Sequence, residues 1–395
     1  MTISLRLPRS RGRGPRSEPL PREVWILSWA NVMVALGYGV ISPAMPAFAH
    51  TFGVSINAVT FLVTVFSLSR LCFAPVSGVL AQRLGERRIY IGGLLIVALS
   101  TIACAYSLTY WQLLFFRGIS GVGSTMFYVS ALGLMIHISP AHARGRIAGL
   151  FTTSFMIGAV GGPAIGGLTA GWGLTAPFIV YGVAMLGVAV VLFYGLRHSE
   201  LAAPLPPTRS TVTMRQALRV RAYWAALLAN FATGWAAFGL RVALVPLFLS
   251  DVMGKSVGMI GVALAAFAAG NAVAVVPSGY LSDRMGRRTL LIIGLAASGV
   301  ATAALGAVST LPAFMVAAAI SGATTGIFMS PMQAAVADIL GSEARAGLPV
   351  AAVQMLSDLG AIVGSVTVGW AAENLSFSWS FTISGIVLLI AAAGW

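Results

Sequence analysis

The sequence predicts an all-α integral membrane protein whose 12 transmembrane helices form two pseudo-symmetric six-helix bundles. Of its 395 residues, 58% are hydrophobic and only 9% are charged, whereas a soluble domain carries about 25% charged residues. A water-soluble fold is therefore excluded. Apolar stretches of about 20 residues, long enough to cross roughly 30 Å of hydrocarbon, recur along the whole chain. The sequence also repeats itself at an interval of about 200 residues, which indicates an internal duplication.

Twelve apolar spans follow one another between short polar breaks. We expect helices rather than barrel strands, because each run is continuously apolar, whereas a barrel strand alternates over about ten residues. The many glycines and alanines fit close helix packing in lipid, where small side chains let backbones approach. The expected limits are 23–49, 57–80, 89–107, 110–137, 147–171, 175–196, 222–250, 257–281, 289–308, 312–340, 347–371 and 377–395.

Two polar segments lie outside the spans. Residues 1–22 are rich in arginine and proline and are expected to form a disordered basic tail in the cytoplasm; the apolar run that follows is too long for a cleaved signal peptide. Residues 197–221, with three prolines and five arginines, are expected to be a cytoplasmic linker between an N-terminal bundle at 23–196 and a C-terminal bundle at 222–395. The last span reaches Trp395, so either the chain stops abruptly or a tail is missing.

The basic residues predict the orientation of the chain in the membrane. Twenty of the 24 lie in the tail or in loops after even-numbered spans, and one, Lys255, lies on the other side. By the positive-inside rule the N-terminus of this multi-pass protein is cytoplasmic. The net charge of +14 is therefore an orientation signal with some attraction to anionic inner-leaflet lipids, and no nucleic acid is expected as a partner. The dominance of arginine over lysine fits a bacterial source and hence a bacterial plasma membrane.

The duplication brings matching segments into register. Residues Gly78–Arg88 fall on Gly279–Arg288, Ile119–Gly121 fall on Ile320–Gly322, and Arg144 falls on Arg345. Two homologous bundles in the same orientation are implied, related by an axis along the membrane normal. Such an arrangement puts a substrate site between the halves near the midplane and allows alternating access.

The paired loop motif carries a resemblance to a known family, the major facilitator superfamily, which covers essentially all of the chain after the tail. The second copy matches the family's pattern throughout, but in the first copy Gln82 stands where the family has Asp and Glu86 where it often has Arg. Glycines permit a tight turn, and the carboxylate can pair with arginines or face a helix N-terminus. The resemblance implies a role in stabilising one conformation; the alternative is topology and turn geometry alone. The residues concerned are Gly78, Gln82, Arg83, Gly85, Gly279, Asp283, Arg284, Gly286 and Arg287.

A few ionisable groups inside the spans are candidates for function, because each costs about 2.5–3.5 kcal/mol or more at the bilayer centre. Asp358 is the carboxylate nearest the middle of any span and is the first candidate for a proton-coupling site; the alternative is a fixed salt bridge. Asp338 is a second candidate for proton coupling, although it lies nearer the cytoplasmic end, where an acid can be solvated. His137 lies at the equivalent place in the fourth span, and its alternatives are an interfacial position and proton coupling. Arg70 and Arg241 are expected in or near the central cavity, but the sequence does not pair them.

Arg117 lies in a string that resembles the family's helix 4 motif, whose arginine is associated with proton transfer in drug antiporters. An arginine does not itself release its proton in this pH range, so its expected role is to set the pKa of a nearby acid or to bind an anion. The alternative is an arginine bonded to carbonyls at a helix end or to a neighbouring helix.

The fifth span contains the string Gly158-Ala-Val-Gly-Gly-Pro-Ala-Ile-Gly-Gly167, which resembles the motif characteristic of antiporters in this superfamily. Proline can kink the helix, and the glycines give a smooth face for tight packing against a partner helix. The resemblance implies the 12-helix drug:proton antiporter group. The motif residues are Gly158, Gly162, Pro163, Gly166 and Gly167.

By the same resemblance, helices 1, 4, 7 and 10 line the substrate cavity. Aromatic and methionine side chains there can accommodate varied apolar ligands, although most such residues in a bundle serve packing. The candidates are Asn31, Tyr38, Met126, Asn230, Trp235, Met329 and Gln333.

The expected function is secondary active transport: proton-coupled export of small amphipathic molecules or drugs by alternating access. A metabolite uptake porter or facilitator of the same fold is the alternative, and a non-transporting membrane sensor is a remoter one. We expect no enzyme, cofactor or metal site, because no metal-ligand or nucleophile pattern is present. The expected partners are the substrate, protons and lipid, and the expected state is a monomer.

Overall fold

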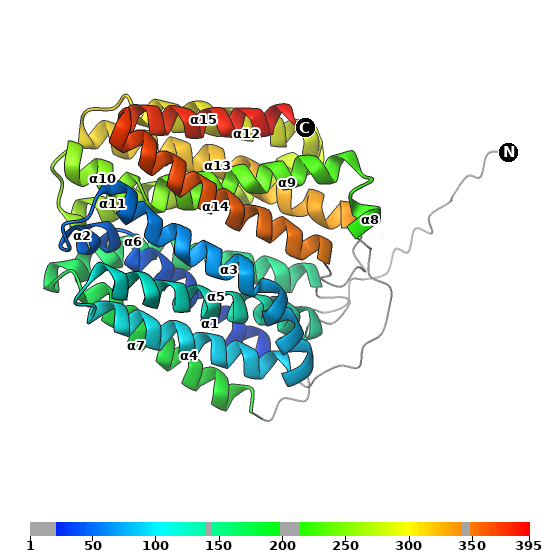
Figure 1. Ribbon diagram of the computed structural model, residues 1–395. Coiled ribbons are helices and arrows are strands. Elements are labelled where there is room, and N and C mark those ends of the chain that lie inside the picture. Colours follow the sequence, from blue (N-terminus) through cyan, green and yellow to red (C-terminus); the bar gives the residue numbers. More distant parts are fainter. Residues whose placement is uncertain (1–20, 139–143, 198–213, 341–347) are drawn as a thin grey trace.

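A computed structural model describes residues 21–138, 144–197, 214–340 and 348–395, and within these ranges every regular element is a helix. Helices occupy all twelve predicted spans and pack side by side (Figure 1). The first six spans are α1 (Arg22–Ile41) with α2 (Ala44–His50), α3 (Ile56–Leu84), α4 (Glu86–Ala105), α5 (Tyr110–Ile138), α6 (Arg144–Thr169) with the short η1 (Ala170–Trp172), and α7 (Ala176–Gly195). A short α8 (Met214–Ala217) and then the second six follow: α9 (Arg221–Gly234) with η3 (Trp235–Val242), α10 (Val245–Leu247) and η4 (Phe248–Val252), α11 (Val257–Met285), α12 (Arg287–Leu305), α13 (Leu311–Leu340), α14 (Leu348–Asn374) and α15 (Phe377–Ala393).

The predicted membrane-spanning class is confirmed. Ten helices among the described residues are long and apolar enough to cross a bilayer, and α15 is a shorter apolar helix. Large apolar side chains such as Trp29, Leu99, Phe115 and Val183 lie exposed on the outer surface of the bundles. A soluble protein does not expose so many, but lipid tails are as apolar as these side chains and solvate them. Residues 1–20 of the expected tail and 198–213 of the expected linker lie outside the described residues.

The first and seventh spans, expected to be continuous, are each broken near the same place in the repeat. The first breaks after Ile41, and α2 begins next to Pro43. The seventh passes into the π-helix η3, turns at Ala243 and Leu244, and resumes at α10 beside Pro246. Proline cannot donate a backbone hydrogen bond, so it favours such breaks, and π-helical turns are often found at functional sites.

The duplication seen in the sequence reappears in the backbone. Gly53 and Gly254 have φ of 68° and 62°, and Gly85 and Gly286 have φ of 88° and 86°. Only glycine adopts such angles readily, and the two members of each pair stand 201 positions apart. Gly85 ends α3 and precedes α4, as Gly286 ends α11 and precedes α12, so the two loop motifs share one conformation.

The two bundles meet along two pairs of helices. α3 lies antiparallel to α14, as Figure 1 shows, and α6 lies against α11. Polar contacts between the bundles begin at the end formed by α2 and α10, where His50 Nε2 lies 3.6 Å from Asp251 Oδ2 and Asn57 donates a hydrogen bond to Glu373. The structure is therefore closed at this end.

Candidate functional site

A buried ion pair joins the two bundles near the middle of α3 and α14. Arg70 Nε lies 3.1 Å from Asp358 Oδ1, and the two side chains are only 10% and 5% exposed. Arg70 Nη1 donates to Ser124 Oγ of α5 over 2.9 Å. Gln354, one helical turn before Asp358, donates to the same Oδ1 over 3.4 Å. Sequence reasoning named both charges as candidates, and the structure brings them together.

The surroundings explain how two charges can be buried here. A buried charge is tolerated when it is paired and hydrogen-bonded, and Arg70 has both kinds of partner. Its Cζ also lies 6.0 Å from the ring centre of Phe66 and 5.7 Å from that of Tyr128. Arg70 has several neighbours besides Asp358, whereas the described hydrogen bonds of Asp358 come from Arg70 and Gln354. A proton added to Asp358 would remove the negative charge that holds the two bundles together at this point.

A cavity of about 30 Å³, called the central cavity below, lies beside the pair. Its lining comes mainly from the N-terminal bundle, and η3 of the other bundle adds Phe238 and Val242. Tyr38 of α1 packs edge-on against Phe66 of α3 and Phe238 of η3, with ring centres 5.8 and 5.7 Å apart. Ser124, which accepts the hydrogen bond from Arg70, also lines the cavity. The wall of this cavity is therefore joined to the ion pair by one hydrogen bond.

Arg117 of α5 lines the same cavity. Its Cζ lies 4.5 Å from the ring centre of Phe66, in a cation–π contact. Its Nε is buried without a hydrogen-bond partner among the described residues. Arg117 thus lies close to the ion pair, but no hydrogen bond joins it to Arg70 or Asp358 among the described residues.

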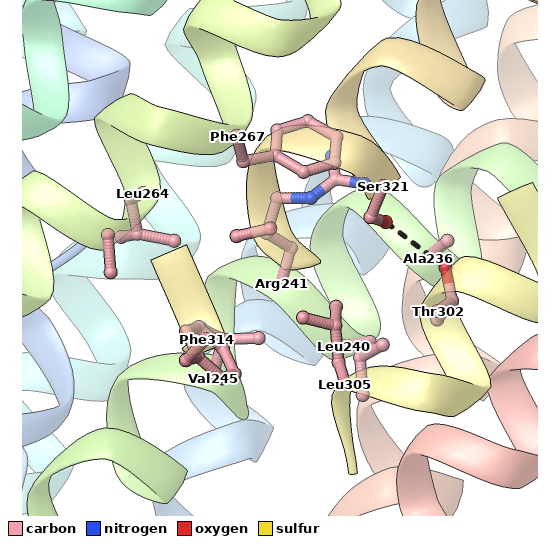
Figure 2. Close-up of a pocket in the computed structure, with 12 residues that line it drawn as sticks. Ala236, Leu240, Arg241, Val245, Leu264, Phe267, Thr302, Leu305, Phe314 and Ser321 are labelled. Atoms are coloured by element: carbon pink, nitrogen blue, oxygen red, sulfur yellow. Dashed lines mark hydrogen bonds between the residues drawn. The ribbon is translucent and has the colours of Figure 1, made fainter. Parts of the chain in front are cut away.

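Arg241 lies in a different cavity, inside the C-terminal bundle (Figure 2). Its Cζ lies 3.4 Å from the ring centre of Phe267. The structure therefore separates Arg241 from Arg70, although both were expected near the central cavity. The side chains of Asp338 and His137 lie outside the described residues.

The glycine string of α6 packs on two neighbours. Gly158, Gly162 and Gly166 lie against α1 so closely that an added Cβ would collide with a backbone carbonyl oxygen at each position. On another face, a Cβ added at Gly167 would lie 2.9 Å from the carbonyl oxygen of Gly258 in α11. The glycines thus allow close packing of α6 on α1 within the N-terminal bundle and on α11 between the bundles.

Pro163 lies inside α6 and takes part in both contacts. A Cβ added at Gly39 of α1 would meet the Pro163 ring at 2.6 Å, and one added at Gly261 of α11 would collide with the Pro163 carbonyl oxygen. These are backbone contacts between helices, which need glycine because any side chain would separate the axes.

The two loop motifs lie at the end opposite α2 and α10. Arg83 and Arg284 are exposed, Arg287 is half-buried, and the side chains of Gln82 and Asp283 lie outside the described residues. Arg87, which sequence reasoning did not single out, donates through Nη1 to the carbonyl oxygen of Leu196 over 2.6 Å. This bond holds the first loop against the end of α7. A Cβ at Gly78 would meet nothing within 4 Å, and one at Gly279 would lie 3.4 Å from Ser330 Oγ.

The expected substrate-cavity residues divide into two groups. Tyr38 lines the central cavity. The other six are not in the lining of that cavity. Asn31 is buried in α1, Met126 packs against Gly93 of α4, and Met329 lies beside Asn271. Asn230 donates to the carbonyl of Ala226 in its own helix, Trp235 donates to Ser384 Oγ over 3.0 Å, and Gln333 is exposed. Sequence reasoning missed the cavity residues Phe66, Ser124 and Phe238. Serine and phenylalanine are too common in membrane helices to be recognised without the fold.

Comparison with known proteins places this arrangement in a family. The family model of the Major Facilitator Superfamily matches residues 27–259 and 226–395. The quinolone resistance protein NorA of Staphylococcus aureus is 26% identical over 181 residues, which cover 45% of this chain and 47% of that protein. Multidrug resistance protein 2 of Bacillus subtilis is 30% identical over 180 residues, which cover 45% of each. The matched part is thus about half the length of these relatives.

Solved structures show the same fold. A bacterial homologue of the human lysosomal transporter Spinster, in an inward-facing and unoccupied conformation, superposes with a TM-score of 0.79 at 17% identity and covers 94% of this chain and 95% of its own. The occupied inward-facing form gives a TM-score of 0.78 at 18% identity.

Proposed function

This chain belongs to the major facilitator superfamily and is a membrane transporter, and on that premise we propose that it exports small amphipathic molecules in exchange for protons. The observation that carries the proposal is the Arg70–Asp358 pair. It joins the two bundles beside a cavity that both bundles line. A titratable group at such a place can couple proton binding to the relative position of the bundles.

The proposed cycle starts from the state described here. With the N-terminus in the cytoplasm, as the distribution of basic residues favours, the end closed by α2 and α10 is the outer one. The central cavity of about 30 Å³ is too small for a substrate as it stands, so in the proposed cycle the bundles first part on the inner side to admit it. The outer end then opens, which separates Asp358 from Arg70. Asp358 then faces the outer solution and takes up a proton while the substrate leaves.

The proton carries the transporter back. Neutral Asp358 can return to its buried place, because a protonated carboxyl is far less costly to bury than an unpaired carboxylate; the closed outer end lacks the attraction of the pair until the proton has left. When the proton leaves toward the inside, the pair with Arg70 forms again and stabilises the closed outer end. One proton enters for each such cycle. The proton and the substrate shift the equilibrium between the two states because each binds one state more tightly than the other.

The lining of the cavity supports amphipathic substrates. Rings from Tyr38, Phe66 and Phe238 offer apolar and aromatic contact, while Arg117 and Ser124 offer hydrogen-bond donors. The related proteins named for quinolone and multidrug resistance favour export over uptake. We further propose a monomer in a bacterial plasma membrane, with the two bundles as its moving units.

Transport by purified protein in vesicles with an imposed pH gradient tests the proposal. A panel of amphipathic compounds should be exported against protons by the wild-type protein, and Asp358→Asn should lose gradient-driven transport while it still exchanges substrate at equilibrium. Glu373→Gln, which also alters a carboxylate between the bundles, is the matched control and should keep coupling. If Asp358→Asn transports normally and still requires the gradient, the coupling role is wrong. Export that survives dissipation of the gradient would indicate a facilitator instead.

A further inference from the structure

The cavity around Arg241 lies within the C-terminal bundle rather than between the bundles. Its walls come from η3, α10, α11, α12 and α13, and its volume is about 20 Å³. Most of the lining is apolar, with hydroxyl groups from Thr302 and Ser321. Figure 2 shows the Arg241 guanidinium between the Phe267 ring and Ser321.

The charge of Arg241 has no anionic partner among the described residues. The guanidinium stacks on Phe267, with Cζ 3.4 Å from the ring centre. Stacking uses the face of the guanidinium, whereas its five N–H donors point outward in its plane. No described residue accepts a hydrogen bond from them, in contrast to Arg70 and Arg87. A charge at this depth calls for a counter-charge.

Two further donors lie at the same cavity. Thr302 Oγ1 and Ser321 Oγ are 3.5 Å apart, and both side chains are buried. Hydroxyl hydrogens rotate toward whatever acceptor is present. A guanidinium and two hydroxyls around one apolar cavity form a set of donors suited to a weakly hydrated anion.

The internal repeat shows that this arrangement exists in both bundles. Phe66 and Ser120 of the central cavity stand 201 positions before Phe267 and Ser321 of the second cavity. Each phenylalanine carries an arginine on its ring, but the arginines come from different helices. Arg117 belongs to α5, whereas the C-terminal bundle has alanine at the equivalent position in α13 and supplies Arg241 from η3 instead. Each bundle thus has an arginine at an equivalent place, although the two arginines come from different helices. This recurrence favours a functional role for the positive charge.

We propose that Arg241, Thr302 and Ser321 form a binding site for one small monovalent anion of about the size of chloride. Water-sized cavities start at about 10–15 Å³, so a cavity of about 20 Å³ has room for a single small ion and excludes the body of an amphipathic substrate. The bound ion neutralises Arg241 and fixes the π-helical turn against α11, α12 and α13. The site is separate from the Arg70–Asp358 pair and independent of the transported substrate.

Thermal unfolding of the purified full chain tests this site. The protein is prepared in gluconate, and chloride or bromide then replaces gluconate at constant ionic strength. A ligand that binds the folded state alone raises the unfolding temperature with a saturable dependence on its concentration. We expect such a rise for both halides, and an anomalous scattering peak from bromide in the Arg241 cavity. An unfolding temperature that is the same in chloride and gluconate would mean that water fills the cavity, and it would overturn the proposal.

Variants locate the response. Ser321→Ala should fold normally and raise the half-saturating halide concentration at least threefold, and Arg241→Met should abolish the response. The control Arg215→Met removes an exposed arginine and should leave the response unchanged. A response that persists unaltered in both Ser321→Ala and Arg241→Met places the ion elsewhere and refutes the assignment. If Arg241→Met does not fold, Ser321→Ala decides the question alone.

Discussion

The pair between Arg70 and Asp358 should hold the outer end of the transporter closed, and Asp358→Asn should release it. At 3.1 Å and an effective dielectric constant of about 20, the Coulomb attraction is about 5 kcal/mol. Removing one partner of a buried pair costs about 3–5 kcal/mol, of which a remaining hydrogen bond from Arg70 to the amide recovers about 1 kcal/mol. A net loss of about 2–4 kcal/mol corresponds to a shift of about 30- to 900-fold toward the outward-open state.

Thiol labelling measures this shift. Thr64 is buried between the bundles, with Oγ1 2.6 Å from Ser365 Oγ, so the cysteine introduced by Thr64→Cys reacts with an impermeant maleimide only when the outer end opens. Its labelling rate is proportional to the open population when closing is fast. In a Cys72→Ser background, Asp358→Asn should raise the rate about 30-fold or more, up to the rate of a fully exposed thiol.

The native Cys104 and a second substitution provide controls. Cys104 is buried inside the N-terminal bundle, so its labelling should stay slow; an equal rise there would mean unfolding rather than opening. Arg70→Gln combined with Asp358→Asn should restore much of the closed population, because neither charge is then left unpaired. A labelling rate at position 64 that stays within twofold of the parent in Asp358→Asn would refute the reasoning.

Three further predictions concern stability, each measured by unfolding in mixed micelles. Gly162→Ala should destabilise the protein by about 1–3 kcal/mol, since its Cβ would collide with the α1 backbone, whereas Gly187→Ala, with nothing within 4 Å, should be neutral. Trp235→Phe should cost about 1 kcal/mol through its lost bond to Ser384. Gly286→Ala should cost about 1–3 kcal/mol, because alanine is strained at φ 86°.

Each of these predictions has a result that contradicts it. Equal effects of the two glycine substitutions in membrane helices would mean that backbone proximity is not what the Gly162 position requires. Full stability after Trp235→Phe would show that Ser384 finds another donor. An unchanged midpoint for Gly286→Ala would show that the loop relaxes to an ordinary φ without loss of packing.

The architecture could be predicted from the sequence because the bilayer leaves few choices. Apolar length and the interval of the repeat were enough to place twelve helices, and the family match and the structure confirm the fold. The breaks at Pro43 and Pro246 had a visible signal, since proline interrupts a helix. The π-helical turn of η3 had none. Because a π-helix has about one more residue per turn than an α-helix, side chains within it, including Arg241, leave the face that regular helical spacing predicts.

The partners of the buried charges could not be predicted, for a related reason. Arg70 and Asp358 are 288 residues apart and meet only because α3 and α14 pack antiparallel. Gln354 could have been found, because it lies one turn from Asp358 on the same helix face. Ser124 could not, since nothing distinguishes one serine of a membrane helix from another. The roles assigned to these residues in proton coupling stay predictions.

The contact between α6 and α11 has a mechanical consequence. At Gly167, Gly258 and Gly261 the two helices touch through backbone atoms, with no side chain between them. Where side chains of two packed helices interlock, those side chains must change rotamer before the helices can move relative to each other. Where two helices touch only through backbone atoms, no side chains interlock, so one helix can rotate against the other without any side chain having to change its rotamer. We therefore expect little resistance to relative movement at this contact, and in the proposed cycle we expect the ion pairs between the bundles to limit the rate instead.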